Sequence, residues 1–106
     1  MMGDFATDTP IPLLVAQGVA LLDIKRPGWF KDIDLVRLEL DNCNDCVLGQ
    51  IYGYFDPGLR NLGIIEDDAW KFGFSRSFDS NMRTWDELNE VWTVTIISRR
   101  MREGGL

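Results

Sequence analysis

The sequence predicts an all-α fold of about five helices, of which two are long, at about residues 12–24 and 85–102. Apolar residues recur at helical spacing in both segments, and a helix-capping pattern stands at the start of the second. The one strand-like stretch has no second stretch to pair with, and a lone strand is not stable. With 106 residues and 45% hydrophobic content, the chain is long enough to bury one core. We therefore expect a single domain over residues 1–106, with flexible ends at 1–9 and 103–106.

The first long helix is predicted to start at two prolines, which a first helical turn tolerates because their missing N–H groups would have no partner there. Thr9 is the candidate N-cap, and Pro27 with Gly28 should end the helix near Lys25. Apolar side chains at positions 13, 14, 16, 19, 20, 21 and 22 are typical of a buried or broadly amphipathic helix. Gly18 lowers helix propensity by about 1 kcal/mol relative to alanine, so we expect a neighbouring element to approach closely there.

The middle of the chain predicts several short helices. The spacing of apolar residues over 34–40 fits neither strict alternation nor a helical stripe, and we favour a short helix capped by Asp34 over a lone strand. The next helix is predicted from about Asn44 to Tyr54, with Asn42 or Asn44 as its cap. Two further short helices are predicted, one that carries Leu59 and Leu62 and one that begins at Glu66 and ends at Gly73.

The second long helix begins with the strongest local pattern in the chain. Thr84 and Glu87 form a capping box, in which each side chain accepts a hydrogen bond from the other residue's backbone N–H. Carboxylates crowd the first turn, and Arg99, Arg100 and Arg102 crowd the last, as the helix dipole favours. We expect this helix to pack across the first long helix and the helix that carries the cysteines.

The charge balance disfavours direct nucleic-acid binding. The chain has 17 acidic and 11 basic residues, a formal charge of −6, whereas nucleic-acid binders neutralise phosphates with a basic surface. An acidic protein can instead imitate a polyanion and occupy a partner's basic groove, although the carboxylates here are spread among apolar residues and do not form runs.

Composition also bears on location and catalysis. The N-terminus is acidic where a secretory signal would be basic, and the longest apolar run covers about twelve positions where a membrane span needs about twenty. We therefore expect a cytoplasmic protein with no membrane partner. The chain has no histidine, so it cannot form a Ser-His or Cys-His catalytic couple.

Cys43 and Cys46 form a C-x-x-C pair that allows three interpretations. As metal ligands they supply two of the four that zinc prefers, so a zinc site would need a homodimer that brings two pairs together. As a redox pair they would benefit from a helix N-terminus, but Asp41 and Asp45 beside them oppose thiolate formation. We favour the third interpretation, in which both are small buried side chains on the apolar face they share with Val47.

Four polar residues are further candidates for interaction: Gln50, Arg99, Arg100 and Arg102. Gln50 adjoins the apolar face of the cysteine helix, and we expect it to clasp the backbone of a loop, such as the one around Pro27, in preference to a catalytic role. The three arginines could hold a phosphate, but their place at a helix end already explains them.

Several different short motifs are spread along the chain. They are Leu21-Leu22-Asp23, Pro27-Gly28-Trp29, Ile33-Asp34-Leu35, Cys43-x-x-Cys46-Val47-Leu48-Gly49-Gln50, Gly53, Leu62-Gly63 and Gly73-Phe74. Together they resemble a set of small proteins of actinobacterial viruses and prophages. The resemblance implies a viral accessory protein that acts inside a bacterial host, and it implies no activity, cofactor or catalytic residue.

From these observations we expect a non-enzymatic, cytoplasmic interaction protein that binds a host protein and modulates it. The first alternative is a thiol-redox protein or a zinc-bridged homodimer built on Cys43 and Cys46. The second is an acidic mimic of nucleic acid.

Overall fold

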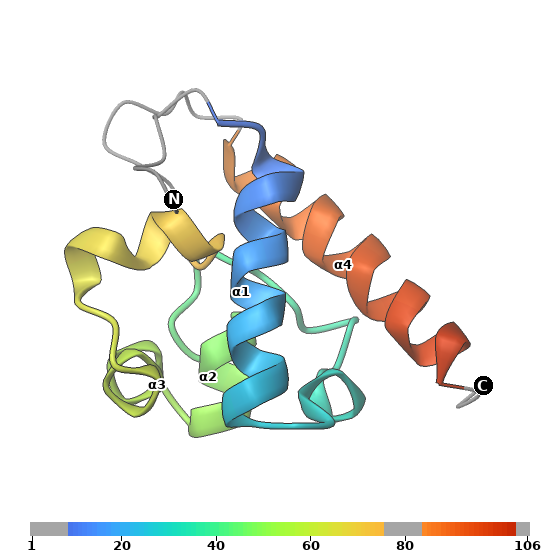
Figure 1. The fold of residues 1–106 in the computed structure, drawn as a ribbon, viewed down its shortest axis with the longest axis horizontal. Coiled ribbons are helices and arrows are strands. Elements are labelled where there is room, and N and C mark those ends of the chain that lie inside the picture. The colour runs from blue at the N-terminus through green and yellow to red at the C-terminus, as the bar shows by residue number, and fades with distance from the viewer. Residues whose placement is uncertain (1–8, 76–83, 104–106) are drawn as a thin grey trace.

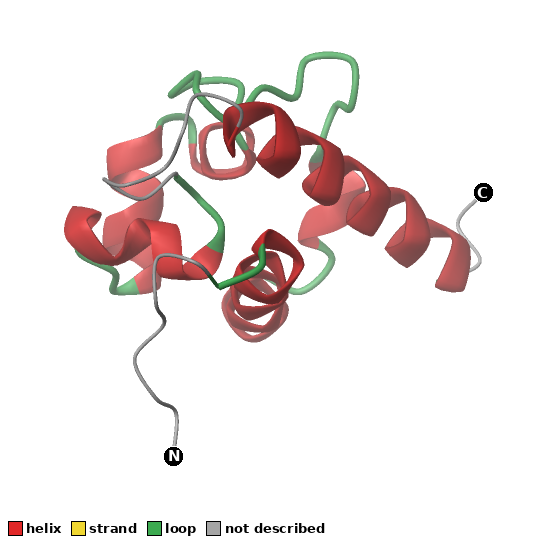
Figure 2. Ribbon diagram, turned by 90° about the horizontal axis from the view of Figure 1, so that it is seen from above, coloured by secondary structure: helices red, strands yellow, loops and turns green. Residues whose placement is uncertain are grey.

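A computed structural model describes residues 9–75 and 84–103, and over these residues the predicted all-α fold is confirmed. The described chain contains helices and loops but no strand (Figure 2). Both long helices lie close to their predicted positions. The elements in order are α1 (Ile11–Lys25), the 3₁₀ helix η1 (Trp29–Asp32), α2 (Val47–Tyr52), α3 (Phe55–Leu62), the 3₁₀ helix η2 (Glu66–Phe72) and α4 (Thr84–Arg102).

Helix α1 is the central element of the fold, with α4 slanting along one side and η2 and α3 on the other (Figure 1). The prediction that the C-terminal helix packs on the first helix is confirmed. The prediction that it also packs across the cysteine helix is wrong, because α2 packs chiefly against α3 and η1. The irregular segment before α2 lies against α4 instead, where the Asn89 side chain accepts a 2.6 Å hydrogen bond from the backbone N–H of buried Leu40.

Three aromatic side chains form the centre of the core. Trp92 of α4 makes an edge contact with Trp29, with ring centroids 5.7 Å apart, and stacks on Phe74 at 5.6 Å. All three are fully buried. The Trp92 indole N–H donates to the carbonyl of Gly73 at 2.7 Å, so the largest buried ring leaves no unpaired donor in the core.

The close approach expected at Gly18 is confirmed. A Cβ atom at this position would lie 2.1 Å from the carbonyl oxygen of Phe72 and 3.1 Å from the Trp92 ring. Glycine therefore allows α1 to lie directly against the end of η2, and it brings the core tryptophan against the helix backbone.

Three local predictions are corrected. Residues 34–40 form neither the short helix nor the lone strand: the Asp34 carboxylate accepts from the backbone N–H of Val36, so the aspartate caps a single turn instead of a helix. The cysteine helix begins at Val47 and not near 44, because Asn42 accepts from two following backbone N–H groups and holds 42–45 as a turn. The cap of α1 is Pro10, not Thr9.

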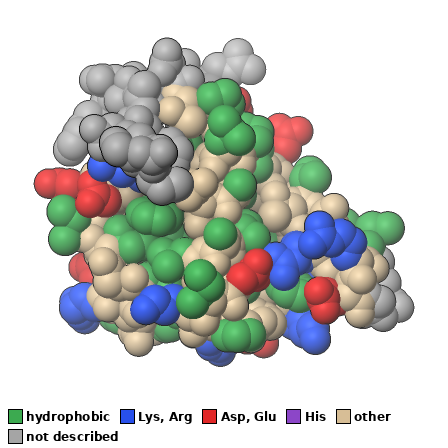
Figure 3. All heavy atoms as spheres, in the orientation of Figure 1, with side chains coloured by type: hydrophobic (Ala, Val, Ile, Leu, Met, Phe, Trp, Pro, Cys, Tyr) green, Lys and Arg blue, Asp and Glu red, His purple; other side chains and the backbone are tan. Residues whose placement is uncertain are grey.

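Some predictions fall on residues outside the described ranges. They are the flexibility expected of the ends, as far as it concerns residues 1–8 and 104–106, and the capping box, which depends on the side chain of Thr84. In the described part of the chain, no helix is long and apolar enough to cross a membrane. On the face seen in Figure 3, hydrophobic side chains gather over the middle, and charged side chains of both signs lie around them.

Candidate functional site

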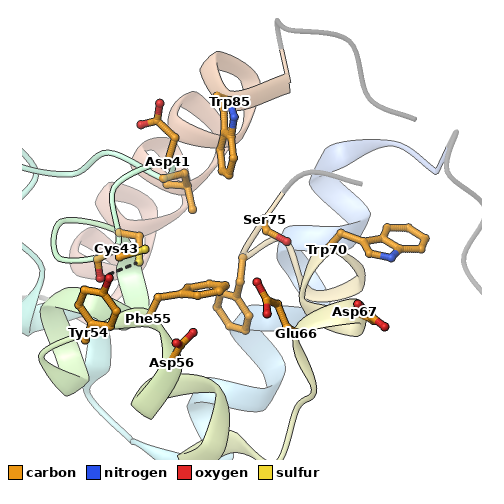
Figure 4. A pocket seen from close by; sticks show the side chains of 13 residues that line it. Asp41, Cys43, Tyr54, Phe55, Asp56, Glu66, Asp67, Trp70, Ser75 and Trp85 are labelled. Carbon is orange, nitrogen blue, oxygen red and sulfur yellow. Dashed lines mark hydrogen bonds between the residues drawn. The ribbon is translucent and has the colours of Figure 1, made fainter. Parts of the chain in front are cut away.

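An open pocket of about 670 Å³ lies where four parts of the chain meet: the turn before α2, the start of α3, η2 with the residues after it, and the start of α4 (Figure 4). The described residues that line it are Leu40, Asp41, Cys43, Cys46, Tyr54, Phe55, Asp56, Glu66, Asp67, Trp70, Phe74, Ser75 and Trp85. We call it the aromatic–acidic pocket, because five of these side chains are aromatic and four are carboxylates.

The carboxylates of the pocket are Asp41, Asp56, Glu66 and Asp67, and all four are exposed. Within the described parts of the chain, none of them has an ion-pair or side-chain hydrogen-bond partner, and no lining residue is basic. Four like charges around one concave surface produce a negative potential that the hollow shape concentrates.

The aromatic rings surround the hollow from different sides. Phe55 extends toward the hollow from α3 and Glu66 extends toward it from η2, while Trp85 of α4 lies across from both (Figure 4). Phe74 forms part of the floor, where it is buried and stacked on Trp92 of the core. The pocket therefore opens directly onto the aromatic core of the protein.

Local backbone geometry positions the two walls. Gly53 ends α2 with a φ of 92°, a left-handed conformation that favours glycine, and Tyr54 follows in extended conformation as the N-cap of α3. This reversal turns Tyr54 and Phe55 toward the pocket. On the opposite wall, Glu66 and Asp67 occupy the first turn of η2, where the exposed N–H groups of a helix start favour negative charge.

The two cysteines occupy different environments. Cys46 is buried, and its sulfur caps α2 by accepting from the backbone N–H of Gly49 at 3.2 Å. Burial raises the pKa of the Cys46 thiol, an effect larger than the opposing hydrogen bond from Gly49, so the neutral thiol is favoured. Cys43 is exposed, so the prediction that both cysteines are buried is wrong for Cys43. The reason is that α2 starts after Cys46, and Cys43 lies in the preceding turn and not on the apolar face of the helix.

Cys43 pairs with Tyr54 at one end of the pocket (Figure 4). A hydrogen bond between the two side chains, together with the charge of a Cys43 thiolate, raises the pKa of the Tyr54 hydroxyl. Within residues 9–75 and 84–103, no group of three or more histidine, cysteine or acidic side chains is arranged to hold a metal ion. A zinc site on Cys43 and Cys46 would thus need ligands from a second chain, as the sequence already implied.

Gln50 clasps the chain, as predicted, but at a different loop. Its side-chain oxygen accepts from the backbone N–H of Asp34 at 2.6 Å, and its amide nitrogen donates to the carbonyl oxygens of Asp34 and Asp45 at 3.2 and 3.0 Å. The clasp therefore joins α2 to the turn at 34 and not to the loop around Pro27. Gln50 does not line the aromatic–acidic pocket.

The arginines near the end of α4 mostly bind the protein itself. Arg99 forms a 2.9 Å ion pair with Asp23, and its guanidinium lies 4.8 Å from the centroid of the Phe30 ring. Arg100 donates to the carbonyl oxygens of Phe30 and Ile33. Arg102 is exposed. Arg99 and Arg100 therefore fasten the end of α4 to α1 and to the η1 region, about 20 Å along the helix from Trp85, and none of the three arginines lines the pocket.

Sequence reasoning did not find the pocket as a unit. It placed Glu66 at the start of a short helix and singled out Cys43 and Cys46, but it did not connect these residues with Phe55 or Trp85. No spacing rule could have done so, because the lining comes from four segments that only the fold brings together. Comparisons of the chain with family models, with curated proteins and with solved structures find no match.

Proposed function

We propose that this chain is a non-enzymatic binding protein that engages another protein through the aromatic–acidic pocket. The observation that carries the proposal is a pocket of about 670 Å³ whose described lining combines five aromatic rings with four unpaired carboxylates. Concave sites with a mainly apolar lining and a few placed polar groups are typical of binding sites, and aromatic residues supply much of the energy of protein interfaces.

The side-chain chemistry supports binding over catalysis. The chain has no histidine to act as a base near neutral pH. The more buried thiol, Cys46, caps a helix and is favoured in its neutral form, which is the less nucleophilic one. The carboxylates of the pocket are exposed to water, whereas a closed active site expels water from around its reacting groups.

The resemblance to small proteins of actinobacterial viruses and prophages supports a host protein as the partner and the bacterial cytoplasm as the place of action. Mimicry of nucleic acid is less well supported. A mimic presents a continuous acidic surface, whereas basic and acidic side chains are interspersed on the face in Figure 3, and the unpaired carboxylates line a hollow.

Affinity capture from bacterial lysate tests the proposal. The bait is the full chain, the pocket variant is Asp56→Asn with Glu66→Gln, and the matched control is Glu39→Gln with Glu90→Gln, which removes two exposed charges outside the pocket. We expect a partner that is enriched by the wild type and the control but not by the pocket variant. Equal capture by all three proteins, or no enriched partner at any salt concentration, would contradict the proposal.

A second candidate function is favoured by one observation, the exposure of the Cys43 thiol at the pocket. In this case two chains join through zinc held by both C-x-x-C pairs. Metal analysis of protein purified without chelator would then give about half an equivalent of zinc per chain, since two chains share one ion. The Cys43→Ser variant would be monomeric. A metal-free monomer would eliminate this candidate.

A further inference from the structure

We propose that the aromatic–acidic pocket takes a cationic side chain, lysine or arginine, carried by a segment of the partner protein. This inference rests on the proposed function and names the chemistry of the ligand. It begins from the charge of the pocket: the four carboxylates have no partner among the described residues, and the described lining supplies no cation. A ligand of opposite charge would neutralise them, and the negative potential would steer it into the hollow.

Elsewhere in this protein, a cationic side chain of the chain itself is held by an aromatic ring and a carboxylate. The guanidinium of Arg99 lies 4.8 Å from the Phe30 ring centroid and 2.9 Å from the Asp23 carboxylate. Each of these groups stabilises the positive charge, the ring through its quadrupole and the carboxylate through an ion pair.

Lys71 repeats this arrangement at η2. Its ammonium lies 6.0 Å from the centroid of the Trp70 ring and 3.2 Å from the Asp68 carboxylate. In both cases one aromatic ring and one carboxylate hold one cation. The aromatic–acidic pocket has the same two kinds of group: Phe55 extends into it from α3 and Glu66 extends into it from η2 (Figure 4), and its described lining contains no cation.

Other ligand classes fit the pocket less well. A phosphate or carboxylate ligand would be repelled by four like charges. A wholly apolar ligand would remove Glu66 and its neighbours from water without a compensating partner, which is strongly unfavourable for a charged group. A single metal ion would leave most of about 670 Å³ unfilled, and the described side chains offer no group of three ligands. A peptide segment fills such a volume and brings the cation with it.

The test is a titration of the ¹⁵N-labelled full chain, followed by amide chemical shifts. The probe is a blocked pentapeptide, Ala-Lys-Ala-Arg-Ala, and the control peptide replaces lysine with norleucine and arginine with citrulline, so that length and bulk are kept and charge is lost. We expect the basic peptide to shift amides of pocket residues and the neutral peptide to bind at least ten times more weakly. Equal binding of the two peptides, no binding of the basic one, or shifts spread over the whole surface would overturn the inference.

Three variants separate the ring from the charge. Phe55→Leu keeps apolar bulk and removes the ring, and we expect the affinity for the basic peptide to fall by about 2- to 30-fold, the range of a cation–π contact. Glu66→Gln keeps the shape and removes one charge, and we expect a similar fall together with a weaker dependence on salt. Glu90→Gln, an exposed position outside the pocket, should leave the affinity unchanged. Equal losses from Glu66→Gln and Glu90→Gln would mean attraction to the net charge and not to this site.

The outcomes distinguish this inference from the proposed function. A lysate partner that depends on the pocket, combined with no preference for the basic peptide, would refute the cationic ligand and leave the binding function intact. A basic peptide seated in the pocket, combined with no lysate partner, would support the ligand chemistry and contradict a host-protein partner.

Discussion

Replacing Gly18 with alanine sets a gain in helix propensity against a steric clash, and the structure predicts which is larger. Alanine is favoured over glycine in a helix by about 1 kcal/mol. Against this, the new Cβ would lie 2.1 Å from the backbone oxygen of Phe72, whereas ordinary contact begins at 3.4 Å. Helix α1 and η2 would therefore have to separate by about 1.3 Å, and backbone cannot rotate away as a side chain can.

The steric clash should outweigh the gain in helix propensity. Overpacking of a core costs about 1–3 kcal/mol, and a backbone contact this short belongs at the upper end or beyond. The Trp92 ring, 3.1 Å from the added atom, would also have to move within the aromatic core. After subtraction of the propensity gain, we expect Gly18→Ala to lower the free energy of unfolding by about 2 kcal/mol or more and Tm by about 8 °C or more.

Urea denaturation followed by tryptophan fluorescence measures the difference, since Trp29 and Trp92 are both buried. The matched control is Ala20→Gly, at an exposed position of the same helix, which should cost about 1 kcal/mol through propensity alone. If Gly18→Ala were as stable as the wild type or more stable, the backbone of α1 at Gly18 could not lie in close contact with the end of η2.

Three further predictions concern the contacts around the core. Gln50→Ala removes three hydrogen bonds between α2 and the preceding turns and should lower the free energy of unfolding in urea by about 1–3 kcal/mol; an unchanged midpoint would show that the clasp contributes nothing. Burial raises the pKa of Cys46 above its ordinary value of 9.0, so the unfolded chain loses this proton first and stability should fall as pH rises above 9.0. The fall in stability caused by Cys46 should be absent in Cys46→Ser and present in Cys43→Ser. Identical pH profiles of the two variants would refute the assignment of this effect to Cys46. Asp23→Ala leaves the largely buried Arg99 without its ion pair and should cost about 1–3 kcal/mol in thermal unfolding, whereas a loss below measurement error would mean that water replaces the carboxylate.

The short irregular segment between η1 and α2 shows where sequence reasoning failed. The spacing of its apolar residues was ambiguous, and the segment forms neither the favoured short helix nor the alternative strand. The conformation depends on partners far away along the chain: the backbone of Leu40 bonds to Asn89, 49 residues on, and the backbone of Asp34 bonds to Gln50, 16 residues on. Local pattern contains no information about such contacts.

The sequence by itself determined the helical class, the two long helices and the need for close contact at Gly18, because prolines, glycines, helix-end charges and apolar spacing act within a few residues of where they stand. The tertiary structure alone decided that Cys46 is buried while Cys43 is exposed, and that four distant segments build one aromatic–acidic pocket. The physical reason is that a pocket exists only where folded elements meet, so its shape and charge depend on packing between segments that the order of residues does not specify.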